Sequence, residues 1–241
     1  MIGMLYWEYY LLGIILLPGI ILGIIAQAKV NNAYSTYSRV YAKSGRSASD
    51  VARLLLDTAG LQDIKITKAN GEMSDYYDPT KKVVALSAPD STSVAALSIA
   101  AHEVGHALQY KTKYAPIYLR TAAIKLTNFS SKMLLPLIII SLLLNFLIFP
   151  TSAFGTILMW ITVGLYGLST LVSLITLPVE FNASKRAKAI LQQTGILQDE
   201  ENQYAKTMLD AAALTYVAAL LISILSLLRI LIVVLRANNR D

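Results

Sequence analysis

The sequence predicts a mostly α-helical integral membrane protein, with about four transmembrane helices and a cytosolic α+β part that carries a small β-sheet. The composition argues against an ordinary soluble domain, because 55% of the 241 residues are hydrophobic and only 15% are charged, against roughly a quarter in soluble domains. Long charge-free stretches recur along the chain. The segments between them contain turn signals and short β-branched runs, which are typical of a folded α+β part.

Four apolar stretches are each about long enough to cross a bilayer core; three carry no charge, and the fourth carries only Arg229, late enough in the run for its side chain to reach the interface. They are residues 10–28, 133–149, 156–177 and 211–235. We interpret the first as a membrane helix and not as a cleaved signal peptide, because a basic start and a small-residue cleavage site are both missing. Pro150 and its neighbours supply the turn between the second and third spans.

The basic residues are distributed unevenly, which predicts the orientation in the membrane. Of the 21 Lys and Arg residues, 18 lie in two segments, 29–132 and 185–206. Two spans separate these segments, so they share one face, which the positive-inside rule places in the cytoplasm. The net charge of +6 is therefore a topology signal. A nucleic-acid partner is not expected, because basic residues interleave with aromatics only briefly.

The cytosolic parts are residues 29–132 and 178–209. In the first of them the patterns predict, in order, a capped helix from Ser49 to Gly60, a strand over 64–67, a turn at Asn70, a strand over 82–87, and a long helix beginning after 89–93. Pro116 opens the next helix, which runs into the second span.

The chemistry is concentrated in that long helix, at His102-Glu103-Val104-Gly105-His106. Residues four apart share one helix face, so the two imidazoles can bind one zinc ion while Glu103 approaches its bound water. The chain has two histidines and no cysteine, so both histidines are used and thiolate chemistry is excluded. The alternative is a pair of surface histidines beside an unrelated glutamate.

A catalytic zinc needs a third protein ligand and leaves its fourth position to water. That ligand must be a carboxylate here, and the candidates are Asp75, Asp78, Asp90, Glu180, Asp199, Glu200 and Glu201. Glu180 has the best setting, because it follows the third span at once and is expected to open a new helix there. Two crossings also return the chain to the face of the histidines. The alternative is that Glu180 begins a helix and is favoured there only by the helix dipole.

Several ordered motifs resemble one family together. The motifs are DYYDP, KVVALS, AAHEVGHALQY, LPVEFNASKRA and AALTYVAALL. Together they resemble the motifs of the neutral zinc metallopeptidases of bacterial membranes, the YugP-like family. The resemblance covers nearly the whole chain. It implies a membrane-anchored enzyme of the gluzincin type in a bacterial cell, with a zincin-like catalytic part; the multi-pass topology and the cytoplasmic side are predicted by the apolar stretches and the basic residues. It also implies that His102, His106 and Glu180 bind Zn²⁺ and that Glu103 is the catalytic base.

The sequence departs from related membrane zinc proteases at one position. In the wider group similar to the heat-shock and prenyl-protein processing enzymes, an Asp is usual four residues after the ligand Glu, where this chain has Ser184. A carboxylate that clamps a zinc-bound histidine is therefore not expected from this position.

The function expected is zinc-dependent hydrolysis of peptide bonds, with protein or peptide substrates, membrane proteins among them. Tyr216 and Arg186 are candidate hydrogen-bond donors to the oxyanion of the tetrahedral intermediate. The alternative for Tyr216 is anchoring at the membrane interface, and the alternative for Arg186 is that it only belongs to the basic residues on the cytoplasmic side. The lipid bilayer is a partner, and a homo-oligomer or a membrane scaffold partner is compatible with the sequence. The rival function is an inactive or regulatory zinc-binding scaffold, or a transport component.

The substrate is expected to pair with an edge strand, as in the enzymes that this chain resembles. The only strong β-branched run just upstream of the metal-binding helix consists of Val83, Val84, Ala85, Leu86 and Ser87. We therefore expect this run to bind an extended peptide through its main chain. The alternative is an ordinary structural strand.

Overall fold

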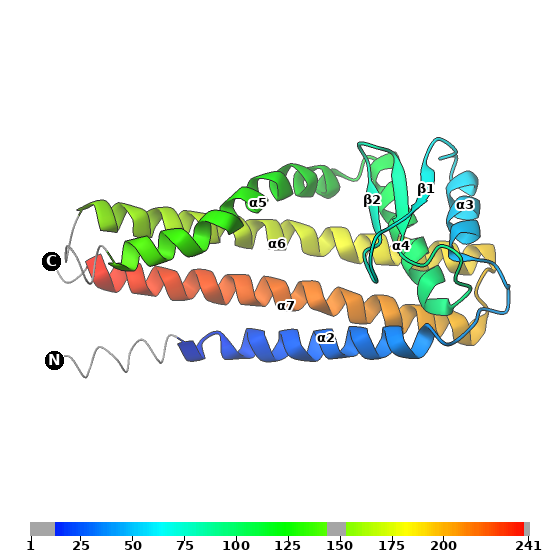
Figure 1. Ribbon diagram of the computed structural model, residues 1–241, viewed down its shortest axis with the longest axis horizontal. Coiled ribbons are helices and arrows are strands. Elements are labelled where there is room, and N and C mark those ends of the chain that lie inside the picture. Colours follow the sequence, from blue (N-terminus) through cyan, green and yellow to red (C-terminus); the bar gives the residue numbers. More distant parts are fainter. Residues whose placement is uncertain (1–12, 144–152, 239–241) are drawn as a thin grey trace. The chain divides into compact units, whose positions relative to one another are not determined.

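The computed structural model describes residues 13–143 and 153–238, and most of them are helical (Figure 1). The elements are α2 (Leu17–Tyr37), α3 (Ala48–Thr58), β1 (Lys65–Lys68), β2 (Tyr76–Asp78), β3 (Val83–Leu86), α4 (Val94–Lys111), α5 (Ala115–Leu142), α6 (Ala153–Thr194) and α7 (Asp199–Asn238). The predicted turn at Pro150 and the ends of the first two predicted spans lie outside the described residues.

The chain divides into two compact units. One contains the apolar parts of α2, α5, α6 and α7. The other comprises Ile25–Tyr118 and Pro178–Thr215, and therefore holds α3, the sheet, α4 and the polar ends of the long helices. The predicted site residues lie in this second unit, except Tyr216, with which a segment of the apolar unit begins.

Within the described residues, two helices are long and apolar enough to cross a membrane, Ile157–Thr194 and Asp199–Arg236. Inside the apolar unit α2 and α7 approach closely, since a Cβ at Gly19 would lie 2.8 Å from the side chain of Ile222. The isoleucines of α2 at positions 20, 21 and 24 are exposed. The two long apolar helices agree with the third and fourth predicted spans by length and composition.

Helix α6 continues without a break past the predicted end of the third span. Pro178 lies inside it, although proline removes one backbone donor and usually ends or kinks a helix. Glu180 therefore does not open a new helix, and that prediction is wrong. The position of Glu180, far from the first turn of α6, also removes the alternative that the helix dipole alone explains this carboxylate.

The N-cap of helix α3 lies two residues earlier than expected. Ser47 is its N-cap and forms a capping box with Asp50, whereas the sequence pointed to Ser49. The helix ends before Gly60, whose φ of 66° suits the left-handed turn there. Its buried side chains pack on α4 and include Val51, Leu55 and Leu56.

The sheet has three strands in the order β1-β3-β2. Strand β3 pairs in parallel with β1 and antiparallel with β2, so the run at residues 83–86 is the central strand. The expectation that Val83–Ser87 supplies a free edge for a substrate is therefore wrong. Burial explains the apolar sequence of β3, because Val84, Ala85 and Leu86 are at most 1% exposed and a central strand is covered on its faces.

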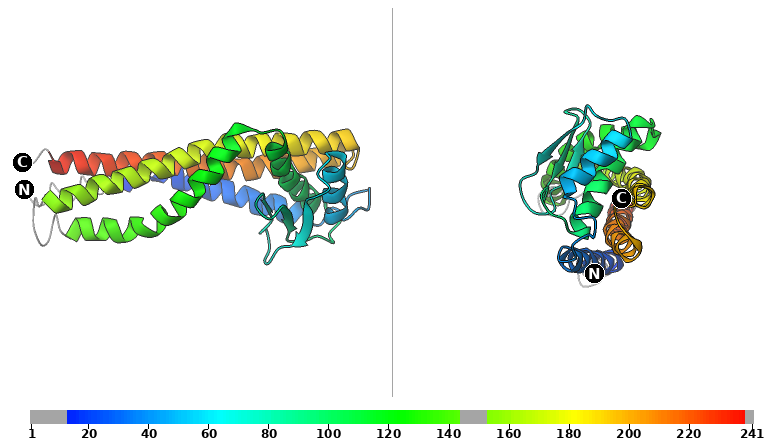
Figure 2. Two further views of the ribbon diagram at one scale, coloured as in Figure 1. Left: turned by 90° about the horizontal axis from the view of Figure 1, so that it is seen from above. Right: turned by 90° about the vertical axis from the view of Figure 1, so that its right-hand side faces the viewer.

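Helix α4 is the central element of the second unit, and α3 and the sheet pack beside it (Figures 1 and 2). The side chain of Ser93 accepts a hydrogen bond from the backbone N–H of Ala96 and so caps its first turn. Small residues such as Ala95, Ala100, Ala101 and Ala107 are buried along it. They allow the neighbouring elements to approach closely and hold the histidine face in a fixed place.

Candidate metal centre

Both histidines of the chain lie on α4, one turn apart, and face α6. Their side chains are 14% and 9% exposed for His102 and His106. Glu103 follows His102 directly and is 8% exposed. The helix geometry thus places all three motif side chains in a nearly dry environment, where electrostatic interactions are stronger than in water.

Glu180 of α6 completes the cluster. One ligand atom from each of His102, His106 and Glu180 lies within 4.8 Å of the others. Oε2 of Glu180 is 3.2 Å from Nε2 of His102 and 3.6 Å from Nε2 of His106. Among the described residues this is the only group of three or more such side chains that could hold a metal ion. Two imidazoles and one carboxylate match the donor set of hydrolytic zinc sites, so the residues fit zinc.

The other ring nitrogen of each histidine has its own partner. Nδ1 of His102 is 3.3 Å from the hydroxyl of Ser184, and Nδ1 of His106 is 3.0 Å from Oε1 of Gln109. Both rings therefore turn Nε2 toward Glu180. At position 184 a hydroxyl therefore contacts the His102 ring.

A close helix contact lies under the cluster. A Cβ at Gly105 would be 2.6 Å from the carbonyl oxygen of Ala183. Real Cβ atoms do not approach an oxygen so closely, so the backbones of α4 and α6 meet where only glycine fits at position 105. Ala183 is fully buried at this contact. The contact holds the histidine helix against the helix that carries Glu180.

Three of the other acidic residues that were candidates for the third ligand accept hydrogen bonds elsewhere in the fold. The carboxylate of Asp75 accepts hydrogen bonds from the backbone N–H and the hydroxyl of Ser87, each at 2.7 Å. Asp78 accepts the backbone N–H groups of Thr80 and Lys81 in the turn that follows β2. Glu201 accepts the backbone N–H of Lys43 and that of Gln198. The remaining candidates, Asp90, Asp199 and Glu200, are exposed.

The family comparison agrees with this donor set. The model of a family described as "putative neutral zinc metallopeptidase" matches residues 12–235. The chain belongs to this family of zinc metallopeptidases. A relative from Bacillus subtilis (strain 168), named "Putative membrane protease YugP", is 41% identical over 218 residues, which cover 90% of this chain and 92% of the relative. No solved structure matches the chain. The resemblance predicted from the motifs is confirmed.

In this member of the zinc metallopeptidase family, the two predicted oxyanion donors, Arg186 and Tyr216, lie on different helices, α6 and α7. Arg186 donates to Oδ1 of Asn182 at 2.8 Å and to the hydroxyl of Thr112 at 2.9 Å, toward the C-terminal end of α4. Tyr216 lies on α7 in the apolar unit. Their roles in catalysis stay predictions.

Strand β2 lies beside the C-terminal part of the metal-binding helix. The rings of Tyr77 in β2 and Tyr110 in α4 have their centroids 5.8 Å apart. Burial of Tyr77, together with the nearby Tyr110, raises its pKa to about 12, so its hydroxyl stays neutral over the ordinary pH range. The structure thus places an edge strand beside the helix that carries His106.

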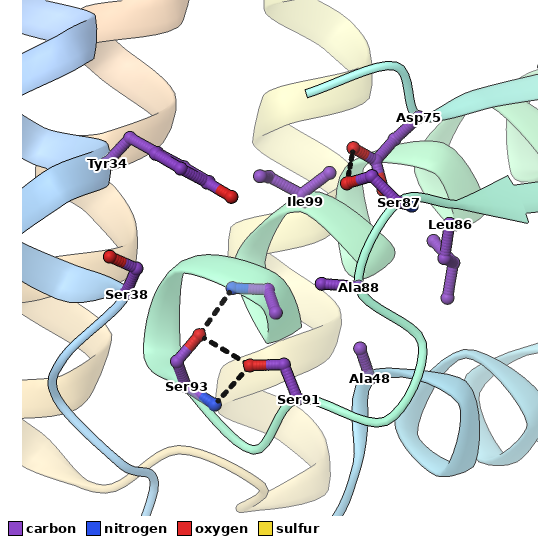
Figure 3. Close-up of a pocket in the computed structure, with 11 residues that line it drawn as sticks. Tyr34, Ser38, Ala48, Asp75, Leu86, Ser87, Ala88, Ser91, Ser93 and Ile99 are labelled. Carbon is purple, nitrogen blue, oxygen red and sulfur yellow. Dashed lines mark hydrogen bonds between the residues drawn. The ribbon is translucent and has the colours of Figure 1, made fainter. Parts of the chain in front are cut away.

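A small cavity of about 50 Å³ adjoins the N-terminal half of α4 (Figure 3). Ile99 and Ala96 of α4, Tyr34 of α2 and the hydrogen-bonded pair Asp75 and Ser87 line part of it. Partial burial, with the negative charges of Glu72 and Asp75, raises the pKa of Tyr34. The phenol is therefore a neutral hydrogen-bonding group at the wall of this cavity.

Sequence reasoning missed Gln109, which contacts a predicted ligand directly. Its position three residues after His106, on the same side of the helix, was a signal that could have identified it. The order of the strands and the separation of Gly105 from Ala183 had no comparable signal, because each depends on how distant segments pack.

Proposed function

We propose that this protein is a membrane-anchored, zinc-dependent endopeptidase that hydrolyses peptide bonds of protein substrates near the cytosolic face of the membrane. The observation that carries the proposal is the convergence of His102, His106 and Glu180 within 4.8 Å, with Glu103 beside His102 on the same buried helix. Two histidines and a carboxylate leave a fourth position for water in hydrolytic zinc sites. Membership of a zinc metallopeptidase family supports the same activity.

The motif glutamate would carry the proton in this reaction. Zinc, when bound, polarises the scissile carbonyl and lowers the pKa of a water molecule toward about 7. Glu103 takes the proton from the attacking water and then gives it to the leaving amine. Its burial keeps bulk water away from this transfer. Glu180 and the two histidines hold their positions throughout, and Tyr216 and Arg186 remain candidates for stabilising the oxyanion.

The substrate would pair with the outer edge of β2. Strand β2 uses one edge to pair with β3, and its Tyr77 packs against Tyr110 of the metal-binding helix. An extended peptide that adds to an edge strand is held by main-chain hydrogen bonds, which need little sequence information. This geometry suits unfolded or partly extracted protein segments as substrates.

The catalytic unit would lie in the cytoplasm of a bacterial cell, with four helices crossing the membrane. The two long apolar helices and the name of the B. subtilis relative support a membrane location. The excess of Lys and Arg in residues 29–132 and 185–206 supports the cytoplasmic side. Juxtamembrane segments of membrane proteins are then the substrates nearest to the site.

The test compares wild-type protein, purified in detergent and loaded with zinc, with the variant Glu103→Gln. An unfolded protein substrate, such as reduced and alkylated casein, is the probe. We expect the variant to keep stoichiometric zinc and to lose about 10²- to 10⁴-fold in the rate of cleavage, because only the proton carrier is removed. Glu72→Gln is the matched control, since the same change is made at an exposed position.

The same experiment separates the proposal from its rival, a scaffold or transport component with a regulatory zinc site. Wild-type protein that binds zinc stoichiometrically but cleaves no unfolded substrate would favour the rival. Cleavage by Glu103→Gln at the wild-type rate would refute the assignment of the base. Cleavage lost in Glu103→Gln but kept in Glu72→Gln supports the peptidase.

A further inference from the structure

Gln109 is a fully buried polar side chain next to the metal ligands. It lies on α4 three residues after His106, and its relative exposure is 0%. A buried amide is unfavourable unless its hydrogen bonds are made, and a methionine or leucine would fill the same space without that requirement. The amide makes three contacts, with Nδ1 of His106, the carbonyl of Val179 and Oδ1 of Asn182.

The carbonyl of Val179 fixes the orientation of the amide. Nε2 of Gln109 donates to this oxygen at 2.7 Å, and a carbonyl oxygen can only accept. The amide nitrogen must therefore point to α6, and Oε1 must point to the imidazole. The contact of Nε2 with Oδ1 of Asn182, at 3.1 Å, requires the same orientation.

The orientation of the amide determines where the proton of His106 lies. Oε1 of Gln109 is 3.0 Å from Nδ1 of His106 and can only accept. Nδ1 must then carry the proton in the neutral ring, and Nε2 keeps its lone pair. Nε2 is the atom that faces Oε2 of Glu180, at 3.6 Å. The ring is thus held in the tautomer that a metal ligand needs.

The same amide also links the two helices of the site. Val179 is the residue before Glu180, so one side chain contacts a ligand ring on α4 and the backbone beside a ligand on α6. Asn182 extends the contact, because its Oδ1 also accepts from Nε of Arg186. The relative position of His106 and Glu180 therefore depends on Gln109.

The geometry points to Gln109 as a positioning residue that selects the Nδ1–H tautomer of His106 and sets the ring against Glu180 for metal binding. It acts through His106 and does not touch the reacting atoms. The inference rests on the metal site of the proposed function, but it does not require that the site hydrolyse peptides. Groups that orient metal-bound histidines in this way typically change metal affinity about 10- to 100-fold when removed.

The experiment reads the tautomer directly in the full-length, metal-free protein. The chain has only two histidines, so after ¹⁵N-histidine labelling in lipid nanodiscs every imidazole signal comes from His102 or His106. His102→Asn assigns the signals. We expect a protonated Nδ1 and an unprotonated Nε2 for His106 in the wild type, and a mixture of tautomers in Gln109→Met, which keeps the length of the side chain.

A second measurement determines zinc affinity by competition with a chelator. We expect Gln109→Met to raise the Kd for zinc about 10- to 100-fold and Gln109→Glu, which keeps an oxygen acceptor, to restore the Nδ1–H tautomer. Gln193→Met is the matched control, because it makes the same change at an exposed position of α6. The control should bind zinc with the wild-type affinity.

Several outcomes would overturn the inference. An Nε2–H tautomer of His106 in the wild type would overturn it without any variant, even if Gln109→Met failed to fold. A folded Gln109→Met protein with unchanged zinc Kd and a lower melting temperature would assign Gln109 a purely structural role. Neither measurement uses hydrolysis, so a failure here leaves the peptidase proposal standing, and an inactive wild type leaves this inference standing.

Discussion

Gly105 of α4 and Ala183 of α6 meet backbone to backbone, and a Cβ at position 105 would lie 2.6 Å from the carbonyl oxygen of Ala183. The glycine inside the histidine motif is therefore a packing requirement. It sets the separation of the two helices that carry the three candidate metal ligands. His106 is the next residue after Gly105, and Ser184, which contacts His102, is the next after Ala183.

Gly105→Ala should push the two helices apart and weaken the metal site. Overpacking of a tight contact typically costs about 1–3 kcal/mol in the free energy of unfolding, and we expect a lower melting temperature together with a higher Kd for zinc. Gly167→Ala is the control, because a Cβ at this helical position of α6 meets no atom within 4 Å. Unchanged zinc affinity in Gly105→Ala would mean that the helix separation does not matter for binding.

Glu180→Gln should lose most of the zinc affinity, because it removes the anionic ligand and keeps the size of the side chain. The loss should exceed the about 10- to 100-fold that removal of a ligand-orienting group produces. Metal analysis after dialysis measures it. Asp75→Asn and Asp78→Asn should retain zinc, since these carboxylates bond to Ser87 and to a turn. Full zinc content in Glu180→Gln would remove Glu180 from the site.

Ser184→Ala should have a small effect on zinc binding. The hydroxyl contacts Nδ1 of His102 at 3.3 Å, and a typical neutral hydrogen bond contributes about 0.5–1.5 kcal/mol, equivalent to about a 2- to 12-fold rise in Kd. Ser173→Ala, on the same helix, is the control, because this hydroxyl bonds only to the backbone oxygen of Ser169 among the contacts described. A loss as large as that of Glu180→Gln would contradict this minor role.

The predicted orientation can be tested with single cysteines, because the native chain has none. In intact cells, cysteines at Ser44 and Gln193 should be shielded from an impermeant thiol reagent, whereas a cysteine at Ser152 should react. Ser44 and Gln193 are exposed in the structure. A lack of reaction there would therefore mean that the membrane keeps the reagent out, and not that the cysteine is buried in the protein. Reaction at Ser44 with protection at Ser152 would place the metal site outside the cell.

The strand prediction failed for a reason that applies to short sheets in general. The run at 83–86 is β-branched and apolar, and these properties identify a strand but not its neighbours. The flanking strands are only four and three residues long, and their pairing on both sides of β3 is a long-range property. The edge beside α4 is therefore Tyr76–Asp78, which has little apolar character to distinguish it in the sequence.

The sequence by itself determined the donor set of the candidate metal site. The i, i+4 spacing places His102 and His106 on one helix face wherever that helix lies, and the absence of cysteine and of further histidine leaves only a carboxylate as third ligand. It also determined the apolar helices, because bilayer length and lack of charge are local properties of the chain. The helix after Pro116 likewise follows from local signals, although it begins at Ala115.

Only the tertiary structure decided which carboxylate joins the histidines and what orients them. Glu180 is 78 residues from His102, and six other acidic side chains satisfied the same chemical requirement. The choice depends on the contact of Gly105 with Ala183 and on the bonds of Gln109 to His106 and Val179. Such contacts arise when distant segments pack together, so their geometry is set by the shapes of both partners and cannot be read from either segment alone.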